Sequence, residues 1–512
     1  MSLKPVRTYL SGHIPTDVCN SFHSVEARQK MMRYRIGKIE GVWKNFVPPV
    51  QGGKFRHYVE GARIVEGTVE DDDTTTSDDS RPPSPVFDIV DSEIRRRNVS
   101  TETGRSSSAS SVSSAEVEDG MSFLEAATQQ AIDLDLAKYP SLDEATQEEI
   151  IRKYRVLDQR LRAENMYDCN YTAYFWESCR YMFLAVTSFV LLRWGYYAAS
   201  GAALGLLWHQ LVFTVHDAGH MGITHNFQVD TTIGMIIASY IGGLSVTWWK
   251  RNHNVHHIVT NSPEHDPDIE HMPFFAISHR FLESLTSSFY GIVMAFDAFA
   301  KAVIPYQAYL YYPVLTFGRF NLYRLSWMHL IFGLGPRKGP AWWHRWFELA
   351  GQVFFWYWFG YLVMYKSIPS NSSRLVFLLV SHMITMPLHA QITLSHFAMS
   401  TAELGPNESF PQKMLRTTMD VACPAWLDFV HGGLQFQAIH HLFPRMPRHN
   451  LRKAQGIVME FCEEVGIPYA LYGFVDGSGQ VIGRLAEVGR QAAILKKCMK
   501  VTAEKGDILH GH

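Results

Sequence analysis

The sequence predicts an all-α membrane protein with four transmembrane helices in two hairpins, several interfacial helices and a helical cap on the cytosolic side. Three observations predict this class. Apolar windows of spanning length occur in two pairs, aromatic residues crowd their borders, and basic residues gather in the long connecting segments. The totals alone do not show it, because 47% hydrophobic and 19% charged residues among 512 are ordinary globular values. A net charge of −2 gives no reason to expect a nucleic-acid partner.

The apolar windows predict the spans directly. Residues 179–199 and 201–215 form one hairpin, and residues 347–365 and 374–396 form the other. Each window approaches the roughly 20 apolar residues that a span requires, if modest tilt and polar ends are allowed. Aromatic side chains suited to a membrane interface flank these windows: Trp194, Tyr196, Tyr197, Trp342, Trp343 and Tyr361.

The remaining segments set the predicted topology. Residues 231–247 and 286–317 are apolar but rich in Gly, Ser, Tyr and Pro, so we expect interfacial or half-inserted helices. Residues 366–373 form a short connection, whereas 216–346 and 397–512 are long and hold most of the Lys and Arg. Basic residues mark the cytosolic side of a membrane. We therefore expect both long segments and both termini in the cytosol, and both hairpin tips in the lumen.

The N-terminal third differs in composition from the rest. Residues 66–118 are rich in Asp, Ser, Thr and Pro and lack the apolar side chains needed to form a core, which predicts a disordered linker. A long ordered surface loop is the alternative. The chain thus divides into 1–65, the linker 66–118 and a membrane domain at 119–512, which opens with charged amphipathic helices over about 121–165.

The histidines carry the strongest chemical signal. Six cysteines lie apart with no Cys-x-x-Cys pair, which argues against a zinc ribbon, an iron–sulfur site or a disulfide scaffold. Three histidine clusters have helical spacing: i and i+4 in the first, i, i+3 and i+4 in the second, and the second pattern with Gln at its first position in the third. In chain order they are His216 and His220; His253, His256 and His257; and Gln437, His440 and His441.

Each cluster alone is a weak signal, but we expect the topology to bring all three together at the membrane boundary on the predicted cytosolic side. Seven imidazoles meeting at a membrane boundary would be costly as unpaired polar groups, and metal coordination offsets that cost. Seven nitrogens exceed one tetrahedral zinc and imply two metals, although imidazole alone does not choose between iron, copper, nickel and zinc. No Glu-x-x-His occurs in the chain, which excludes the carboxylate-bridged di-iron bundle.

Other polar residues are assigned around these clusters. His396, at the predicted cytosolic end of the last span, is expected to be an eighth ligand, with a core histidine bonded to a backbone carbonyl as the alternative. That alternative is favoured for His209, His382 and His389, while His225, His265 and His271 are expected to be surface or outer residues. Four carboxylates are candidates to orient ligand imidazoles: Asp217, Asp266, Asp268 and Asp428.

The order His-x-x-x-His, His-x-x-His-His, Gln-x-x-His-His, with the intervening spans, resembles the membrane fatty acid desaturase family over about residues 170–470. Gln437 in the third box resembles the front-end branch, whose members act near the polar end of the lipid and in which Gln437 would have a catalytic role. The stretch from Gly432 to Arg445 resembles the sphingolipid delta-8 desaturases, particularly the fungal ones.

The resemblance implies a specific activity. Two irons held by the histidines would reduce O2, and a trans double bond would form at carbon 8 of the long-chain base of a ceramide or glucosylceramide, in the endoplasmic reticulum membrane. One alternative is a front-end acyl-lipid desaturase of the delta-5 or delta-6 type. Others are a lipid hydroxylase and a catalytically silent lipid-binding relative.

The first residues resemble part of a cytochrome b5 domain, which front-end desaturases usually carry. The segment from Phe22 to Arg28 resembles the second haem-ligand segment, with His23 as the ligand, but the family's His-Pro-Gly-Gly segment has no counterpart, and His13 lies too close to His23 to replace it. Residues 1–65 are therefore interpreted as a partial remnant, with an exposed helix residue as the alternative for His23. We expect no stable haem binding, and electrons from a separate cytochrome b5 and its NADH-dependent reductase, unless the start of the chain is missing or mispredicted.

Overall fold

A computed structural model describes residues 14–33, 56–57, 85–86 and 114–509 of the chain. These residues are mostly helical, as predicted, with two sheets of two short strands each. The expected linker at 66–118 lies almost entirely outside the described residues. What is described of it is β2 (Pro85–Val86), which pairs antiparallel with β1 (Arg56–His57), and the start of α3 (Ser114–Lys138).

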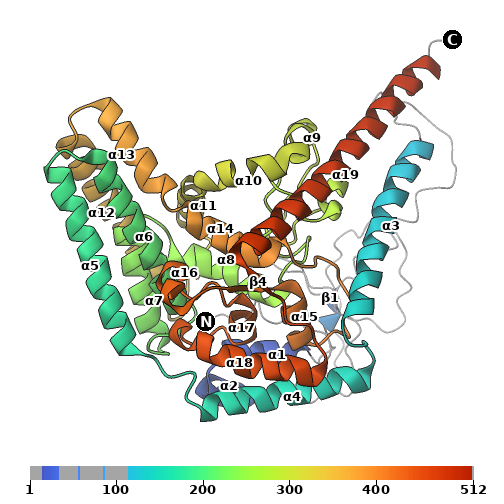
Figure 1. Cartoon of the computed structure of the whole chain (residues 1–512), viewed down its shortest axis with the longest axis horizontal. Coiled ribbons are helices and arrows are strands. Elements are labelled where there is room, and N and C mark those ends of the chain that lie inside the picture. Colours follow the sequence, from blue (N-terminus) through green and yellow to red (C-terminus); the bar gives the residue numbers. More distant parts are fainter. Residues whose placement is uncertain (1–13, 34–55, 58–84, 87–113, 510–512) are drawn as a thin grey trace, which may run out of the picture.

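The first predicted hairpin is confirmed as a pair of long apolar helices, α5 (Tyr171–Arg193) and α6 (Tyr197–Gly219). Both are long and apolar enough to cross a membrane. In the most apolar stretch of α5 only 6% of residues are buried inside the protein, against 67% in α6. Helix α5 is therefore the outer helix of the arm at the left of Figure 1, and α6 is the inner one.

Small residues bring α6 close to the second predicted hairpin. A Cβ added at Gly205 would lie 2.5 Å from the Ser381 carbonyl oxygen on α13 (Asn371–Met383), so the two backbones approach in a way that only glycine permits. Helix α13 continues into α14 (Met386–Phe397), which begins with Pro387 in its first turn. The combined segment Asn371–Phe397 is the third helix long and apolar enough to span a membrane.

The fourth expected span differs from the prediction. Residues 347–365 fall on α12 (His344–Phe355) and on a π-helix, η6 (Trp356–Ser367), neither of which is long enough alone. By length and composition, the described residues hold three candidate spans. The physical reason is the change of helix type at Phe355, which sequence periodicity cannot reveal.

Shorter helices connect the arm formed by α5, α6 and α13 to a second arm, which carries α10. The interfacial segment expected at 231–247 covers part of α7 (Phe227–Met235), the π-helix η3 (Ile236–Ile241) and the start of α8 (Val246–Val259). The one expected at 286–317 is helical only from α9 (Ala298–Val303) onward. Aromatic side chains on this part of the protein are exposed, as expected for an interfacial element: Tyr306, Tyr309, Tyr312 and Phe317. The helices that follow α9 are η5 (Ile304–Tyr306), α10 (Gln307–Thr316) and α11 (Gly318–Phe332).

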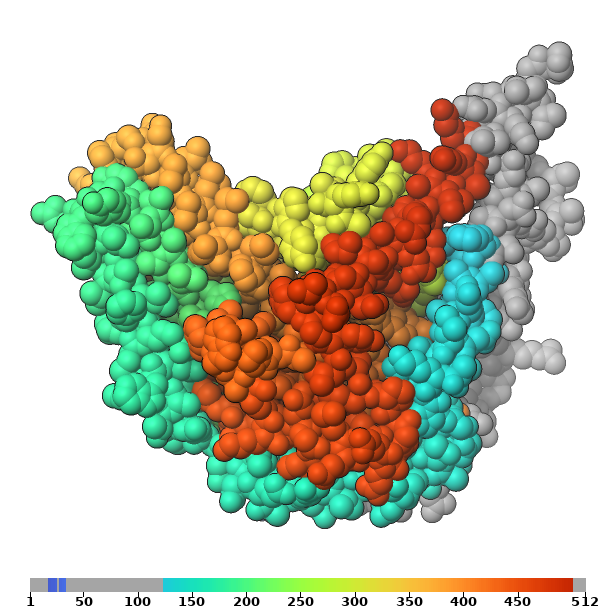
Figure 2. All heavy atoms as spheres, in the orientation of Figure 1, coloured from blue at the N-terminus to red at the C-terminus, as the bar shows by residue number. Residues whose placement is uncertain are grey.

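A helical cap lies below the two arms in Figure 1, with α4 (Glu144–Ala163) and α18 (Arg448–Val465) along its lower edge. Its core joins Tyr154 and Leu157 of α4 to Phe443 and Phe461. Figure 2 shows the opposite side of the protein hollowed between the arm that carries α13 and the arm that carries α10.

The remaining described elements complete the cap and the second arm. Helix α1 (Ile14–Phe22) is held to α4 by an ion pair between Asp17 and Arg155, 2.9 Å long. Strand β3 (Asp420–Ala422) pairs in parallel with β4 (Leu471–Gly473). The others are α2 (Val25–Met32), η4 (His279–Glu283), α15 (Phe410–Thr417), η7 (Ala425–Leu427), α16 (Asp428–His431), α17 (Gln437–Leu442) and α19 (Phe474–Leu509).

Candidate metal centre

The first two histidines lie at the C-terminal end of α6. His216 is in the last turn and His220 is the residue that ends the helix, so the i, i+4 spacing puts both rings on one face, 4.8 Å apart. Asp217, between them, accepts a hydrogen bond from Arg448 Nε at 2.9 Å and another from the Tyr174 hydroxyl. These bonds fix the end of α6 against α5 and α18.

The second cluster lies on α8, whose N-terminus is anchored. The Ser245 side chain caps the helix by accepting from the Trp248 amide at 3.0 Å, and Ser245 in turn donates to Glu348 of α12 at 2.9 Å. The i, i+3, i+4 spacing then directs three buried rings to one face: His253, His256 and His257.

The remaining histidines come from two other helices. His396 is buried in the last turn of α14. His440 and His441 lie on α17, a short helix oriented by Asp420, which accepts from the Ala438 amide at 2.8 Å and from the Tyr469 hydroxyl. A carboxylate that receives amide hydrogens at a helix N-terminus stabilises that orientation.

Histidines from these four helices, far apart in sequence, form two groups, and within each group the ligand atoms lie within 4.8 Å of one another. The first group holds His216, His220, His253 and His440, and the second holds His256, His396 and His441. His257 lies between them, with its ring centroid 4.8 Å from that of His220 and 4.1 Å from that of His441. The structure thus brings together all eight histidines predicted as ligands, in an arrangement suited to two metal ions.

The ring nitrogens test whether a metal fits. Buried polar atoms in proteins are almost always hydrogen-bonded, yet six of these eight residues have a buried ring nitrogen without a protein partner. The six atoms are His216 Nε2, His220 Nε2, His257 Nδ1, His396 Nδ1, His440 Nε2 and His441 Nε2. So many unpaired acceptors in one place fit metal ligation, since coordination would satisfy each of them.

Carboxylates hold the other two rings. His256 Nδ1 donates to Asp266 at 2.8 Å and His253 Nδ1 to Asp268 at 3.2 Å, so the Nε2 atom of each ring is the one available to a metal. These two orienting roles were predicted. The same role predicted for Asp217 and Asp428 was wrong. Asp217 bonds Tyr174 and Arg448, and Asp428 bonds Arg452 and Gln435.

Burial keeps most of these imidazoles neutral, which is the form that binds a metal. It lowers the pKa of His257, His440 and His441 well below the ordinary histidine value, and neighbouring imidazoles lower each pKa further. Burial also lowers the pKa of His256, but Asp266 outweighs it and the net pKa is raised.

The two other predicted site residues, Gln437 and His23, lie on separate elements. Gln437 is buried as the first residue of α17, one turn before His440. His23 follows α1 and is half-buried, with its Nδ1 donating to the Cys19 carbonyl at 2.8 Å, so it is not the fully exposed residue of the alternative interpretation. The neighbouring Phe22 ring meets the His257 ring edge-on at 5.8 Å, which places α1 beside the metal centre.

The other histidines divide into satisfied and unsatisfied rings. His382 is the satisfied core residue that was predicted, because its Nδ1 donates to the Leu378 carbonyl at 2.8 Å. His225 bonds two backbone carbonyls and is exposed, as expected. His389 differs, because its buried Nε2 has no protein partner.

Sequence reasoning missed two residues that follow α8 directly. The Thr260 hydroxyl lies 3.1 Å from His441 Nδ1, and Asn261 donates to the His396 carbonyl at 2.8 Å. Their position directly after the second cluster was the available signal. Together they link α8 to the two other helices that carry histidines of the second group.

Comparison with known proteins agrees with this geometry. A family model described as fatty acid desaturase matches residues 192–473, more than half of the chain. A Delta 8-(E)-sphingolipid desaturase of Emericella nidulans is 61% identical, over 98% of this chain and 91% of its own. A protein of the same name from Kluyveromyces lactis is 48% identical, over 96% and 87%. A Delta(8)-fatty-acid desaturase of Helianthus annuus is 40% identical, over 57% and 62%.

The family match covers all three histidine clusters and the helices that bring them together. Relatives far above 30% identity cover nearly the whole chain. The chain therefore belongs to the fatty acid desaturase family.

Proposed function

We propose that this protein is an O2-dependent desaturase that introduces a trans double bond at carbon 8 of the long-chain base of a ceramide or glucosylceramide. One observation carries the proposal: eight histidines, seven of them buried, converge as two groups with His257 between them, in a chain 61% identical to a Delta 8-(E)-sphingolipid desaturase. The resemblance of the stretch from Gly432 to Arg445 supports the same substrate class.

The residues have distinct roles in this proposal. His216, His220, His253 and His440 would hold one iron, His256, His396 and His441 the other, and His257 would complete the set between them. Two irons would supply the O2 activation that is needed to remove hydrogen from an unactivated methylene. Asp266 and Asp268 hold the imidazoles of His256 and His253 in one tautomer. Gln437 lies one turn from His440, where it would contact the reacting part of the lipid chain.

The membrane placement follows from the same arrangement. We propose four spans in the endoplasmic reticulum membrane, with α12 and η6 together as the fourth, and with both termini in the cytosol. The three helices long and apolar enough to cross support this, as does the position of the histidines at the ends of α6 and α14. A separate cytochrome b5 and its NADH-dependent reductase would deliver electrons to this cytosolic side.

A second candidate is an acyl-lipid substrate. The Helianthus annuus relative, named Delta(8)-fatty-acid desaturase, favours it. That relative matches a smaller share of the chain than the fungal sphingolipid desaturases do.

Expression with a cytochrome b5 partner, in a host that lacks this activity, tests the proposal. Mass spectrometry of the sphingolipids and acyl lipids should find a long-chain base lighter by two hydrogens, with a trans double bond at carbon 8. An altered acyl profile with unchanged long-chain bases would move the assignment to the acyl branch, and a product that gains oxygen would indicate a hydroxylase. His225→Ala, a change of an exposed histidine outside the centre, is the matched control for ligand variants.

A further inference from the structure

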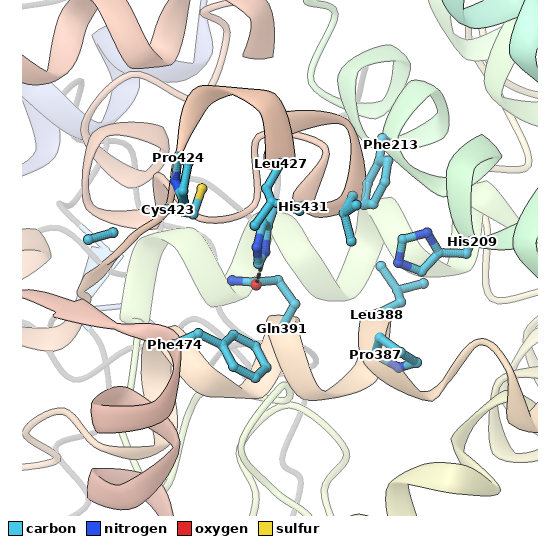
Figure 3. Close-up of a pocket in the computed structure, with 12 residues that line it drawn as sticks. His209, Phe213, Pro387, Leu388, Gln391, Cys423, Pro424, Leu427, His431 and Phe474 are labelled. Carbon is cyan, nitrogen blue, oxygen red and sulfur yellow. Dashed lines mark hydrogen bonds between the residues drawn. The ribbon is translucent and has the colours of Figure 1, made fainter.

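A cavity of about 390 Å³ lies between the spans and the cap, and its lining residues could not be predicted from the sequence. Its walls come from α6, α14, the segment from β3 to α16, and the start of α19 (Figure 3). Its volume falls within the range of small-molecule sites, roughly 300–1,000 Å³. The lining includes His209 and Phe213 of α6, Leu388 and Gln391 of α14, and His431 of α16.

Two polar side chains meet inside this mostly apolar cavity. His431 Nδ1 and Gln391 Oε1 are 2.6 Å apart, and Gln391 Nε2 points at the Leu434 carbonyl at 3.4 Å, which fixes the orientation of the amide. Because an amide oxygen only accepts, Nδ1 carries the proton and Nε2 of the neutral His431 ring is an acceptor. Burial lowers the pKa of His431, which favours this neutral form.

His209 provides the complementary group from α6. Its Nδ1 lies 3.3 Å from Gln210 Nε2, and that amide also donates to the Phe429 carbonyl at 2.8 Å. The amide nitrogen is a donor, so His209 Nδ1 accepts and its Nε2 carries the proton. The lining therefore includes one imidazole that can donate and another that can accept (Figure 3).

The lining contains no Lys, Arg, Asp or Glu. A phosphate, or any other charged head group, would be buried here without a charged partner, at a large cost in free energy. The composition instead suits a neutral group that both donates and accepts hydrogen bonds, with an apolar chain attached. Hydroxyl and secondary amide groups have this property.

Along α14, the spacing between the cavity and the proposed ligands matches a short length of lipid chain, and along α6 it is slightly longer. His209 precedes His216 by seven residues on α6, which is about 10 Å along the axis, and Gln391 precedes His396 by five on α14, about 7–8 Å. An extended hydrocarbon chain advances about 1.25 Å per bond, so carbons 2 and 3 of a long-chain base lie about 6–8 Å from carbon 8. Phe213, one turn before His216, continues the apolar wall toward the ligands.

Exposed aromatic side chains beside one wall of the cavity suit contact with a lipid layer. Trp426 and Phe429, on the η7–α16 segment that forms one wall, are 72% and 47% exposed. Exposed aromatic side chains of this kind sit at membrane interfaces. A lipid could therefore enter laterally, with its polar end leading.

We infer that this cavity receives the neutral polar end of the long-chain base, with His431 and Gln391 bonding one of its hydroxyl or amide groups and His209 another, so that carbon 8 reaches the metal centre. The inference rests on the proposed function and adds the residues that recognise the substrate. It also explains how the protein selects a position counted from the polar end. The polar cluster fixes one end of the chain, and helix geometry fixes the distance to the metals.

Two variants of the intact protein test this, measured with a ceramide and with a matched ceramide that lacks the carbon 3 hydroxyl. His431→Phe and Gln391→Leu remove polar atoms and keep most of the side-chain volume. The KM for the ceramide should rise about tenfold, as expected for the loss of one or two hydrogen bonds in a buried site. The kcat should change by less than about twofold, and discrimination against the deoxy substrate should fall. Gln129→Leu, on the exposed face of α3, is the matched control and should behave as the wild type.

The outcomes separate the two claims. Full iron content and unchanged KM in both variants would overturn the role of the cavity, and so would an equal rise of KM for both substrates, since that would reflect altered packing alone. A second readout is the double-bond position, which should scatter to carbons next to carbon 8 in the variants and stay fixed in the control. If the wild type forms no unsaturated long-chain base at all, the proposed function fails, and the inference fails with it.

Discussion

At the scale of single residues, the carboxylates beside the metal centre act by holding imidazoles. Asp266 is fully buried and accepts both from His256 Nδ1 and from the Asn261 amide, each at 2.8 Å. Asp266→Asn keeps the size but removes the charge that fixes the His256 tautomer, so iron should be retained about 10- to 100-fold less well. Iron content after dialysis against a chelator measures this. Asp133→Asn, on exposed α3, should retain iron as the wild type does, and equal retention in the two variants would contradict the role of Asp266.

The proposed ligands themselves give a sharper result. His256→Ala and His441→Ala each remove one imidazole from the second group, so turnover should fall below detection. Membrane insertion should be unchanged, because insertion depends on the apolar helices and not on the metal. Product formation measured by mass spectrometry, with immunoblotting of the membrane fraction, tests both parts. Product at more than a few per cent of the His225→Ala control would show that the ligand assignment is wrong.

A buried lysine makes the stability of the folded protein depend on pH. Lys250 Nζ is buried without a hydrogen-bond partner, although part of the stem is exposed. Burial lowers its pKa from 10.5 to about 8, against the attraction of Asp230. Because the folded state binds this proton less tightly than the unfolded state, stability should rise with pH between about 8 and 10.5.

Lys250→Met tests whether this lysine makes stability rise with pH. At pH 7 the variant should be more stable than the wild type by at most about 3 kcal/mol, and the gap should close as the pH approaches 10. Thermal unfolding in detergent across this pH range measures the effect, with Lys153→Met as a control for removing a lysine that pairs with surface carboxylates. A gap that stays constant or widens with pH would contradict it.

At the scale of elements, the sequence predicted those parts in which one periodicity dominates. The i, i+4 pattern of His216 and His220 and the i, i+3, i+4 pattern after His253 placed each ring on the correct face of its helix. The change from α-helix to π-helix at Phe355 was not predictable, because the same apolar residues suit either. The cavity beside His431 was not predictable either, since Gln391 and His431 meet only through the tertiary fold.

Glycine at the end of α16 is required by two independent features. Gly432 has a φ of +59°, and a Cβ there would lie 2.0 Å from Phe213 Cγ. Gly432→Ala should therefore destabilise the protein by more than the roughly 1 kcal/mol of a left-handed alanine, because Phe213 must also move. Gly456→Ala is the matched control. It lies in α18 with open space around it and should stabilise by about 0.5–1 kcal/mol, so opposite shifts in melting temperature are expected.

At the scale of the whole molecule, the metal centre depends on elements from both ends of the described chain. Helix α1 reaches it through the contact between Phe22 and His257, and α17 brings the last two proposed ligands. Sequence reasoning could join the three clusters because so many imidazoles with the same helical spacing indicate shared metal ions, although only the first cluster directly follows a predicted span. It could not place α1 there, because no periodic pattern links residues 14–22 to a helix more than 200 residues away.

Electron supply is the property that tests this whole-molecule organisation. His23 donates its Nδ1 proton to the Cys19 carbonyl, while the adjacent Phe22 packs against His257, so we expect this segment to cover the candidate metal centre and not to bind haem. The purified protein should therefore show no Soret band of bis-histidine character. Turnover with NADH should require added cytochrome b5 and its reductase, and His23→Ala should turn over within about twofold of the wild type.

Phe22→Ala should leave turnover dependent on cytochrome b5 but speed the loss of iron to a chelator, because it opens the packing beside His257. A Soret band, or turnover without added cytochrome b5, would instead make the N-terminal segment an electron carrier in its own right.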